Sequence, residues 1–597
     1  MKTTLTFMLA AVALSVCVDG DAGPARLADE LMMNRENPGR TNYVRGEKFD
    51  HNGGEPASCP TIMMNATRGH VNGGCRQGSV NRSVMKKAIK AFDAGDVVQA
   101  WEVLDLYLSG LAEMTPPVDL DHGHIQTLVG FQTFEVIHED LCQEVAQLYE
   151  RLKPYIDANH PAKRAVYDAA LRKWADLIAE NGVPDNNWNI IQARFIYAIA
   201  KVLPKADHDR YLDMILHAKM TRQWGLKTLA DACFDAETGI WNESPGYSVN
   251  VINDYIELAE LFKREEGIDL YNEIPVVNKA IATIGEWTFP DGMLIGFGDT
   301  HPGKKYPVST TPLFIAPNWL VRREGDMAFA LNGSEGNHQH ANGISLETYA
   351  FGSRRGVDAG IGFSLYGGDD YREYYSRFPA HNTVCVDGVS DYPVMKSHHP
   401  YRVVATNDWA VRVAFVEPET QSDQERVTGI VDGRYFVDVF RSRRRDGRDK
   451  FHDYFYHNLG TNLVLSVATA PTEELAFAGG HLYAYSYFWD QMKGDGSSAV
   501  TAEWTDGMRL VMAGSPDRAV YAVKAPPTEG LSRIPVQPYD LKTSPTHTFI
   551  ARQRGEAWER PFVCAMDPSG VVKSIALDGN TVRIVHFDGT EKTLPLP

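Results

Sequence analysis

Polar and ionisable side chains gather in four short stretches of this chain whose neighbours are mostly apolar. They are residues 185–189, 242–247, 336–342 and 380–384. The last two stretches contain His338, His340 and His381, and Asp358 lies between them. His338 and His340 are separated by one residue, so on an extended strand their side chains would point the same way.

Metal binding is the first chemistry that these residue types permit. Two imidazoles and one carboxylate offered from separate strands, His340, Asp358 and His381, suit Zn²⁺ with a fourth position open to water. The separations along the chain are too wide to be diagnostic, because three unrelated polar residues at strand edges would give the same pattern.

The elements that must position these residues differ between the two halves of the chain. From about residue 83 to 266 apolar residues recur at helical spacing, with Val97, Trp101, Leu104 and Leu108 as one stripe. Short Pro, Gly or Asn breaks, such as residues 115–117 and 181–184, separate the helical stretches. The pattern predicts a series of antiparallel helix pairs.

After about residue 303 the apolar period changes to two. Residues 435–440 and 451–456 alternate on either side of a turn at residues 445–448, which predicts a β-hairpin. Asp-Gly pairs at 578–579 and 588–589 predict further turns. The second half is therefore expected to be antiparallel β structure. The basic run at residues 441–450 is interpreted as a solvated turn rather than a polyanion site.

The composition limits the possible partners. The 597 residues carry 59 basic and 77 acidic side chains, so the formal net charge is 59 − 77 = −18. With 44% hydrophobic residues the chain resembles an ordinary globular enzyme. Its charge argues against nucleic acid binding, and a polyanionic partner would have to meet a local basic or metal-lined site.

The N-terminal residues have the features of an export signal. Lys2 precedes an apolar run to Val18 that is too short to span a bilayer, so residues 1–20 are expected to be a signal peptide. Secretion, most simply to a periplasm, is the expectation, and lipoprotein anchoring at Cys17 is the weaker alternative. Residues 21–82 are expected to form an irregular arm, in which a disulfide between Cys59 and Cys75 is open. No later segment has the length of a membrane span.

Several of these stretches together resemble one known family. Residues 337–388, with His-x-His at 338–340 and the segment 381–388, resemble the heparinase II/III-like domain of polysaccharide lyases. Matching stretches in the same order are 186–189, 243–247, 291–299, 435–440 and 452–457.

The resemblance implies a fold and a reaction. The fold is α+β: an incomplete (α/α) toroid, expected over residues 83–312, followed by antiparallel β-sheets over residues 313–597. The reaction is β-elimination on a polysaccharide that contains uronic acid, either alginate or a weakly sulfated glycosaminoglycan. A glycoside hydrolase or a non-catalytic carbohydrate-binding protein is the alternative, and homodimerisation is open.

The resemblance also implies roles for individual residues. Tyr247 falls on the base and acid, Asn187 on the residue that neutralises the substrate carboxylate, with Asn186 as its alternative in register, and His338 on the active-site histidine. His340, Asp358 and His381 fall on the ligands of a zinc ion whose role is structural. Tyr374 or Tyr375 is near the place of a second active-site tyrosine.

Simpler roles compete with these assignments. Asn187 could cap a helix, and Tyr247 could be a packed, hydrogen-bonded tyrosine. Arg377 could hold a substrate carboxylate or pair with Asp369 or Asp370. Glu243 and Asp299 are expected to anchor turns. The Lys that follows His-x-His in alginate-cleaving relatives is absent, and residues 342–345 stand in its place. This weakens alginate specificity, and alginate and weakly sulfated glycosaminoglycans both stay open.

Overall fold

The computed structural model describes residues 73–597 except 114–126, 129–131, 134–140, 181, 302, 363–369, 395, 478–481 and 529–543. The expected signal peptide, Cys17 and the proposed Cys59–Cys75 disulfide lie outside the described residues, as does most of the 21–82 arm. The chain is already helical from Gly73, so the last part of the expected arm is not irregular.

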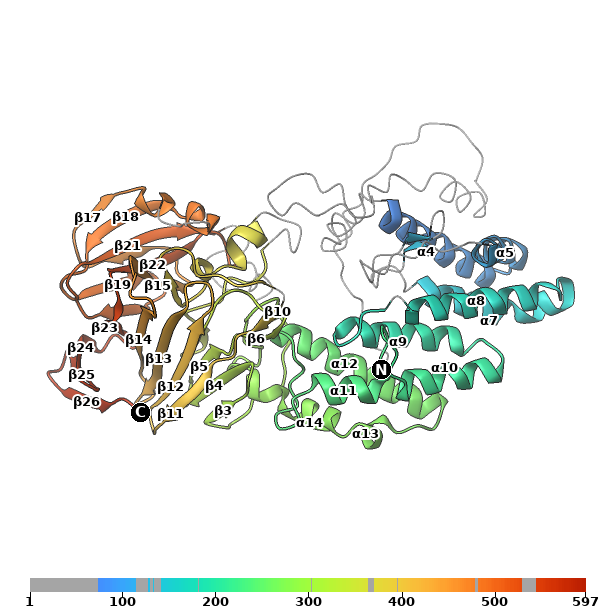
Figure 1. Ribbon diagram of the computed structural model, residues 1–597, viewed down its shortest axis with the longest axis horizontal. Helices are drawn as coiled ribbons and strands as arrows, with labels where there is room; N and C mark the ends of the chain where they lie inside the picture. The colour runs from blue at the N-terminus through green and yellow to red at the C-terminus, as the bar shows by residue number, and fades with distance from the viewer. Residues whose placement is uncertain are drawn as a thin grey trace.

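The first half consists of helices that pack on their neighbours in the chain (Figure 1). Their bounds are α4 Gly73–Asp93, α5 Val97–Glu113, α7 Leu141–Asn159, α8 Lys163–Glu180, α9 Asn187–Ala200, α10 Lys205–His217, α11 Leu226–Cys233, α12 Pro245–Glu265, α13 Leu270–Glu273, α14 Val276–Thr283 and the 3-10 turn η1 Ile284–Trp287. The short pair β1 Thr127–Leu128 and β2 Gln132–Thr133 also falls in this half. Leu104, Leu108, Trp174, Tyr255 and Leu258 are buried in one core, so the predicted helical stripes are confirmed.

The second half is built from antiparallel sheets, as the alternating pattern predicts. A five-stranded sheet has the order β3-β4-β5-β7-β8, and β6 pairs with β10. The bounds are β3 Leu313–Ile315, β4 Trp319–Glu324, β5 Met327–Asn332, β6 Glu335–Asn337, β7 Leu346–Ala350, β8 Ser353–Arg354 and β10 Lys396–His398. The helical half followed by antiparallel sheets is therefore confirmed, whereas closure of the helices into a toroid stays a prediction.

Two larger sheets and a small one complete this half. The eight-stranded sheet has the order β11-β12-β13-β14-β23-β20-β19-β16, with bounds Arg402–Thr406, Ala410–Glu417, Ser422–Val431, Tyr435–Arg444, Ala557–Met566, Arg509–Met512, Val500–Trp504 and Leu463–Leu465. The six-stranded sheet has the order β17-β18-β21-β22-β15-β9, with bounds Thr469–Pro471, Trp489–Asp495, Arg518–Ala525, Thr546–Arg554, Phe451–Asn458 and Val384–Val386. The chain closes with β24 Val572–Asp578, β25 Thr581–His586 and β26 Glu591–Pro595, joined at the two predicted Asp-Gly turns.

The hairpin predicted for residues 435–456 is wrong. β14 pairs with β13 and β23, whereas β15 pairs with β22 and β9 in the other large sheet. Both strands are buried on two faces, and their alternating aromatic residues fill the core between the sheets. Alternation is typical of a hairpin, but it fits two strands of stacked sheets equally well.

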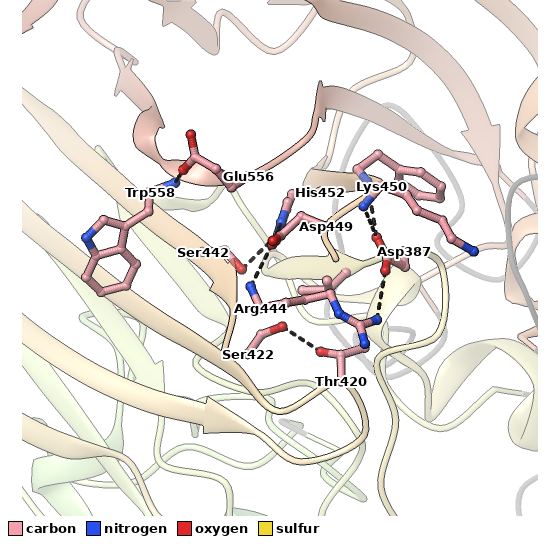
Figure 2. A network of polar contacts seen from close by, with 12 residues as sticks. Asp387, Thr420, Ser422, Ser442, Arg444, Asp449, Lys450, His452, Glu556 and Trp558 are labelled. Carbon is pink, nitrogen blue, oxygen red and sulfur yellow. Dashed lines mark hydrogen bonds and ion pairs between the residues drawn. The ribbon is translucent and has the colours of Figure 1, made fainter. Parts of the chain in front are cut away.

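The basic run at residues 441–450, between these strands, forms hydrogen bonds and ion pairs with carboxylates (Figure 2). The Arg444 guanidinium donates to Asp387 at 2.9 Å, and the backbone N–H groups of Arg444 and Lys450 donate to Asp449 and Asp387. His452 bonds Asp449 at 2.9 Å through Nε2. The run is therefore an ion-paired crossover between two sheets.

None of the helices among the described residues has the length and apolar character to cross a membrane. Within the described ranges, Cys142, Cys233, Cys385 and Cys564 are buried and form no disulfide.

Candidate active site

The four polar stretches meet where the helical half adjoins the sheets. β6 and β10 lie at this junction, beside the end of α12 that carries Tyr247 (Figure 1). Asn337 on β6 forms a parallel bridge with Glu243 just before α12, and its N–H donates to Asn242 O at 3.0 Å. These backbone contacts join the helical residues to the segment that begins with His338.

Tyr247 and His338 form the centre of this site. Their rings are stacked, with centroids 3.5 Å apart and planes 8° from parallel. Tyr247 lies in the first turn of α12, where the helix dipole favours negative charge. His338 has a positive φ of 55°, an uncommon backbone conformation for a residue other than glycine that is found at functional sites.

Asp299 connects the two histidines of the His-x-His segment. Its Oδ2 lies 2.8 Å from His338 Nδ1, and its Oδ1 lies 3.0 Å from His340 Nε2. Burial alone would raise the pKa of Asp299, but the hydrogen bonds to both imidazoles hold that pKa well below its usual range. Asp299 is thus a buried carboxylate that orients two imidazoles, which is more than the turn anchor expected from the sequence.

A close backbone approach makes this arrangement possible. Gly298 has φ of +60°, and a Cβ at this position would meet His338 O at 2.3 Å. The Asp299 N–H donates to that same carbonyl at 3.0 Å. Glycine at position 298 therefore lets the two chain segments lie in contact.

The two neighbouring asparagines divide the competing roles between them. Asn186 is the N-cap of α9, and its Oδ1 accepts from Trp188 N at 2.8 Å. Asn187 is the first residue of the helix, and its N–H donates to Glu243 Oε1 at 3.1 Å. Capping is therefore the task of Asn186, which leaves the half-buried amide of Asn187 as the candidate for substrate contact.

His340, Asp358 and His381 are brought together as the sequence predicts. Their ligand atoms all lie within 4.8 Å of one another, and all three residues are buried. His381 Nδ1 lies 2.8 Å from Asp358 Oδ2. Within the described part of the chain, His340 Nδ1 and His381 Nε2 have no hydrogen-bond partner, although buried polar atoms are normally paired.

The donor set fits a divalent metal ion. Burial raises the pKa of Asp358 to about 7 and lowers that of His381 to about 3, so a compensating cation would favour the ionised carboxylate and the neutral imidazole together. His340 already bonds the Asp299 carboxylate through its other nitrogen, which is the usual arrangement for a histidine that binds zinc.

Of the three tyrosines in this stretch, Tyr371 is the one that contacts the Asp299 carboxylate. Tyr375 donates to Pro527 O at 2.8 Å, and Tyr374 is buried against Tyr487 and Phe488. Tyr371, one turn earlier in η3 Tyr371–Tyr375, donates to Asp299 Oδ1 at 3.1 Å and packs edge-on against His340.

Arg377 is engaged by protein groups. Its Nη1 lies 2.5 Å from Asp391 Oδ1, and its Nε donates to Arg372 O. The predicted pairing with Asp370 is not found, and Asp369 lies outside the described residues. Because Asp391 already neutralises the guanidinium, Arg377 is a poor candidate for binding a substrate carboxylate.

Comparison with known proteins agrees with the resemblance inferred from the sequence. Residues 323–445 match the family model described as heparinase II/III-like, C-terminal, and residues 237–318 match that of the endo-acting ulvan lyase second domain. An endo-acting ulvan lyase of Formosa agariphila is 25% identical over 281 residues, which is 40% of this chain and 33% of the relative. The match thus spans about a third of that protein's length.

Solved structures share the fold at low identity. The heparan sulfate lyase of Pedobacter heparinus is 13% identical with a TM-score of 0.52, over 97% of this chain and 90% of that one. A heparinase III is 14% identical with a TM-score of 0.56, over 95% and 90% of the two chains. The two-part architecture around the site is common to these proteins, and the resemblance drawn from the sequence is confirmed.

Proposed function

Because the chain carries a heparinase II/III-like C-terminal domain, we propose that it is a polysaccharide lyase that cleaves an acidic, uronate-containing polysaccharide by β-elimination. The observation that carries this proposal is the stacked Tyr247–His338 pair, oriented by buried Asp299 at the junction of the two halves. A phenol stacked on an imidazole, with the Asn187 amide on the neighbouring helix start, offers the groups that such an elimination requires.

Neutralisation of the substrate carboxylate is the first task. Removing the C5 proton places a second negative charge beside the C6 carboxylate, so the reaction needs groups that favour the enolate-like transition state. The Asn187 amide and the His338 imidazole are proposed to donate hydrogen bonds to that carboxylate. Asp299 orients His338 for this task through the 2.8 Å bond to its Nδ1.

Proton transfer is assigned to Tyr247. The phenolate takes the C5 proton, and the C5–H electron pair becomes the C4–C5 double bond as the C4–O4 bond breaks. The tyrosine then returns its proton to O4 of the leaving sugar. The N-terminus of α12, where Tyr247 lies, favours the phenolate. Tyr371 shares Asp299 with the histidines and is proposed to position that carboxylate.

Zinc is proposed to bind to His340, Asp358 and His381 with a structural role. When bound, the ion would supply a fixed positive charge that holds these three segments together. His340, held by the ion, would in turn fix the position of Asp299 through their hydrogen bond, and Asp299 would fix that of His338.

The substrate class follows from the chemistry and from the relatives. A uronate is required by the mechanism, and the similar proteins are named for ulvan and for heparan sulfate. Alginate and weakly sulfated glycosaminoglycans remain in the test panel with these two. Export through the N-terminal signal, to a periplasm or beyond, would place the enzyme where such polymers occur.

A product assay tests the proposal. The protein is incubated with ulvan, heparan sulfate, chondroitin, hyaluronan, alginate and pectin, and the ultraviolet absorbance of the unsaturated uronate is followed. We expect absorbance to rise with one or more polymers, and Tyr247→Phe to abolish the rise. Reducing ends that appear without absorbance would mean hydrolysis, and no cleavage of any polymer would favour a binding protein; either result contradicts the proposal.

A further inference from the structure

Glu243 is a fully buried carboxylate between two elements of the candidate active site, and it has no task in the reaction proposed above. One of its oxygens contacts the start of α9, and its backbone pairs with β6. We propose that Glu243 is a positioning residue that holds the Asn187 amide in place relative to His338, so that both can meet one uronate carboxylate. This role rests on the proposed lyase function.

The contact with α9 completes the start of that helix. The first N–H groups of a helix have no acceptor within it. The Asn186 side chain accepts from the N–H of Trp188, and its backbone O accepts from that of Asn189 at 3.1 Å. The Asn187 N–H donates instead to Glu243 Oε1, which comes from a segment 56 residues further along the chain. The position of Asn187 therefore depends on where the Glu243 side chain lies.

Glu243 is itself held on both sides. Its N–H donates to Trp241 O at 2.7 Å, and its carbonyl accepts from Ser248 Oγ, near the start of α12, at 3.3 Å. Its parallel bridge with Asn337 places it next to the segment that begins with His338. One side chain thus joins α9 to the two elements that carry the stacked rings.

This carboxylate costs stability where it lies. Burial raises the pKa of Glu243, and His338 opposes that shift. Among the described residues Oε2 accepts no hydrogen bond, and the Trp241 indole N–H beside it is also unpaired. A buried acceptor without a donor is unfavourable, so an apolar side chain would serve the fold better. A costly group of this kind is typical of a functional site.

The reaction requires two groups from different halves of the chain to converge. A uronate carboxylate carries both oxygens on one carbon, so the Asn187 amide and the His338 imidazole can both donate to it only from fixed, adjacent positions. Glu243 bonds to the first and borders the second through its bridge to β6. The reach of its side chain, rather than its charge, is what this task demands.

Two conservative variants separate reach from charge. Glu243→Asp keeps the charge but is shorter by one methylene group, so it cannot reach the Asn187 N–H without a shift of the chain. Glu243→Gln loses the charge and keeps an acceptor oxygen at the same distance. The control is Glu417→Asp, at an equally buried carboxylate after β12 that accepts the Thr420 N–H at 2.8 Å. Each variant is assayed for unsaturated product and melting temperature, and for polymer binding without turnover in the Tyr247→Phe background.

We expect Glu243→Asp to lower kcat about tenfold or more with ulvan or heparan sulfate, since a small misplacement of a substrate-binding group is costly. Glu243→Gln should stay within about threefold of wild type, because its oxygen still accepts the hydrogen bond. The distant Glu417→Asp should change kcat by less than about twofold. Asn187→Ala combined with Glu243→Asp should be no slower than Asn187→Ala alone, because Glu243 acts through Asn187.

The proposal is overturned by a Glu243→Asp variant with near wild-type kcat, or by a Glu243→Gln variant that is as slow as Glu243→Asp. Losses that multiply in the double variant overturn it too, as does an equal loss in Glu417→Asp, which would reduce the effect to stability. A wild-type protein that binds the polymers but releases no unsaturated product refutes the lyase function alone. The positioning role is then decided by binding, which Glu243→Asp should weaken and Glu243→Gln and Glu417→Asp should not. A protein that neither binds nor cleaves the polymers overturns both.

Discussion

The imidazole of His338 lies parallel to the phenol of Tyr247, with 3.5 Å between the ring centroids. An imidazole in this position packs on the face of the phenol ring and fixes its orientation. The stacking therefore links the residue proposed to neutralise the substrate with the residue proposed to take its proton.

Tyr247→Phe should remove catalysis and leave the fold intact. The ring and its stacking on His338 remain, whereas one hydroxyl that performs two proton transfers is lost. We expect kcat to fall at least about 10²–10⁴-fold, measured by the ultraviolet assay beside a melting curve. A variant that folds normally and keeps more than about a tenth of wild-type turnover would show that Tyr247 is not the base.

Substitution of the two neighbouring asparagines should have different effects, one on activity and the other on stability. Asn187→Ala should lower kcat, though less than Tyr247→Phe, since water can partly replace the amide, and should leave the melting temperature nearly unchanged. Asn186→Ala removes the α9 cap and should cost about 1 kcal/mol of stability with little effect on kcat. The reverse pattern would mean that the substrate contact belongs to Asn186.

Tyr371 and Tyr375 offer a matched pair in one short helix. Tyr371→Phe removes the hydrogen bond to Asp299 and should lower kcat about tenfold or more, because Asp299 then orients His338 less well. Tyr375→Phe removes the bond to Pro527 O and should cost about 1 kcal/mol of stability without a large change in kcat. Equal effects on kcat would contradict the assignment of Tyr371.

Elemental analysis should find close to one Zn²⁺ per chain. His340→Ala and His381→Ala should each lower the metal content and the melting temperature, as should removal of the metal by a chelator, since structural zinc stabilises the folded state. His398→Ala, at an exposed histidine on β10, is the control. Protein without metal, or His340→Ala with unchanged content, would remove the site.

The buried imidazole of His457 should make the folded state less stable in acid. Burial, reinforced by His381, lowers its pKa to about 3, whereas the unfolded chain has a value near 6.5. The unfolded state therefore gains a proton first as the pH falls, and stability is full above about pH 6.5 and declines below it. Between pH 7 and 5 this contribution is about 2 kcal/mol. His457→Gln should show a shallower pH dependence in urea unfolding by that amount; identical slopes would contradict it.

The sequence predicts the helical half well because its signal is local. Trp174 and Leu108 repeat at the spacing of a buried helix face, and both lie in the core. The strands at residues 435–440 and 451–456 were also predicted as strands, but their pairing was wrong. Partners in a sheet depend on distant residues such as those of β22 and β23, which local alternation does not specify.

The candidate active site likewise contains residues that the sequence predicts and residues that it does not. His340, Asp358 and His381 could be found because the resemblance fixes them individually. Tyr371 was missed because three tyrosines share a short π-helical turn, whose wider spacing turns a different face toward Asp299 than an α-helix would. The central role of Asp299 depends on its three bonds to distant side chains, of which its own neighbours in the sequence give no sign.

The crossover from β14 to β15 also governs the order in which the protein can fold. β14 pairs with β23, and β15 pairs with β22. Each of these central strands can therefore complete its pairing only after a partner about a hundred residues further along the chain has been synthesised. Such non-local pairing is slow because a long loop must close first. During synthesis the helical half can condense early, while the two large sheets stay incomplete until Met566 has emerged. Until then, the aromatic faces of these strands are exposed to aggregation and to proteases.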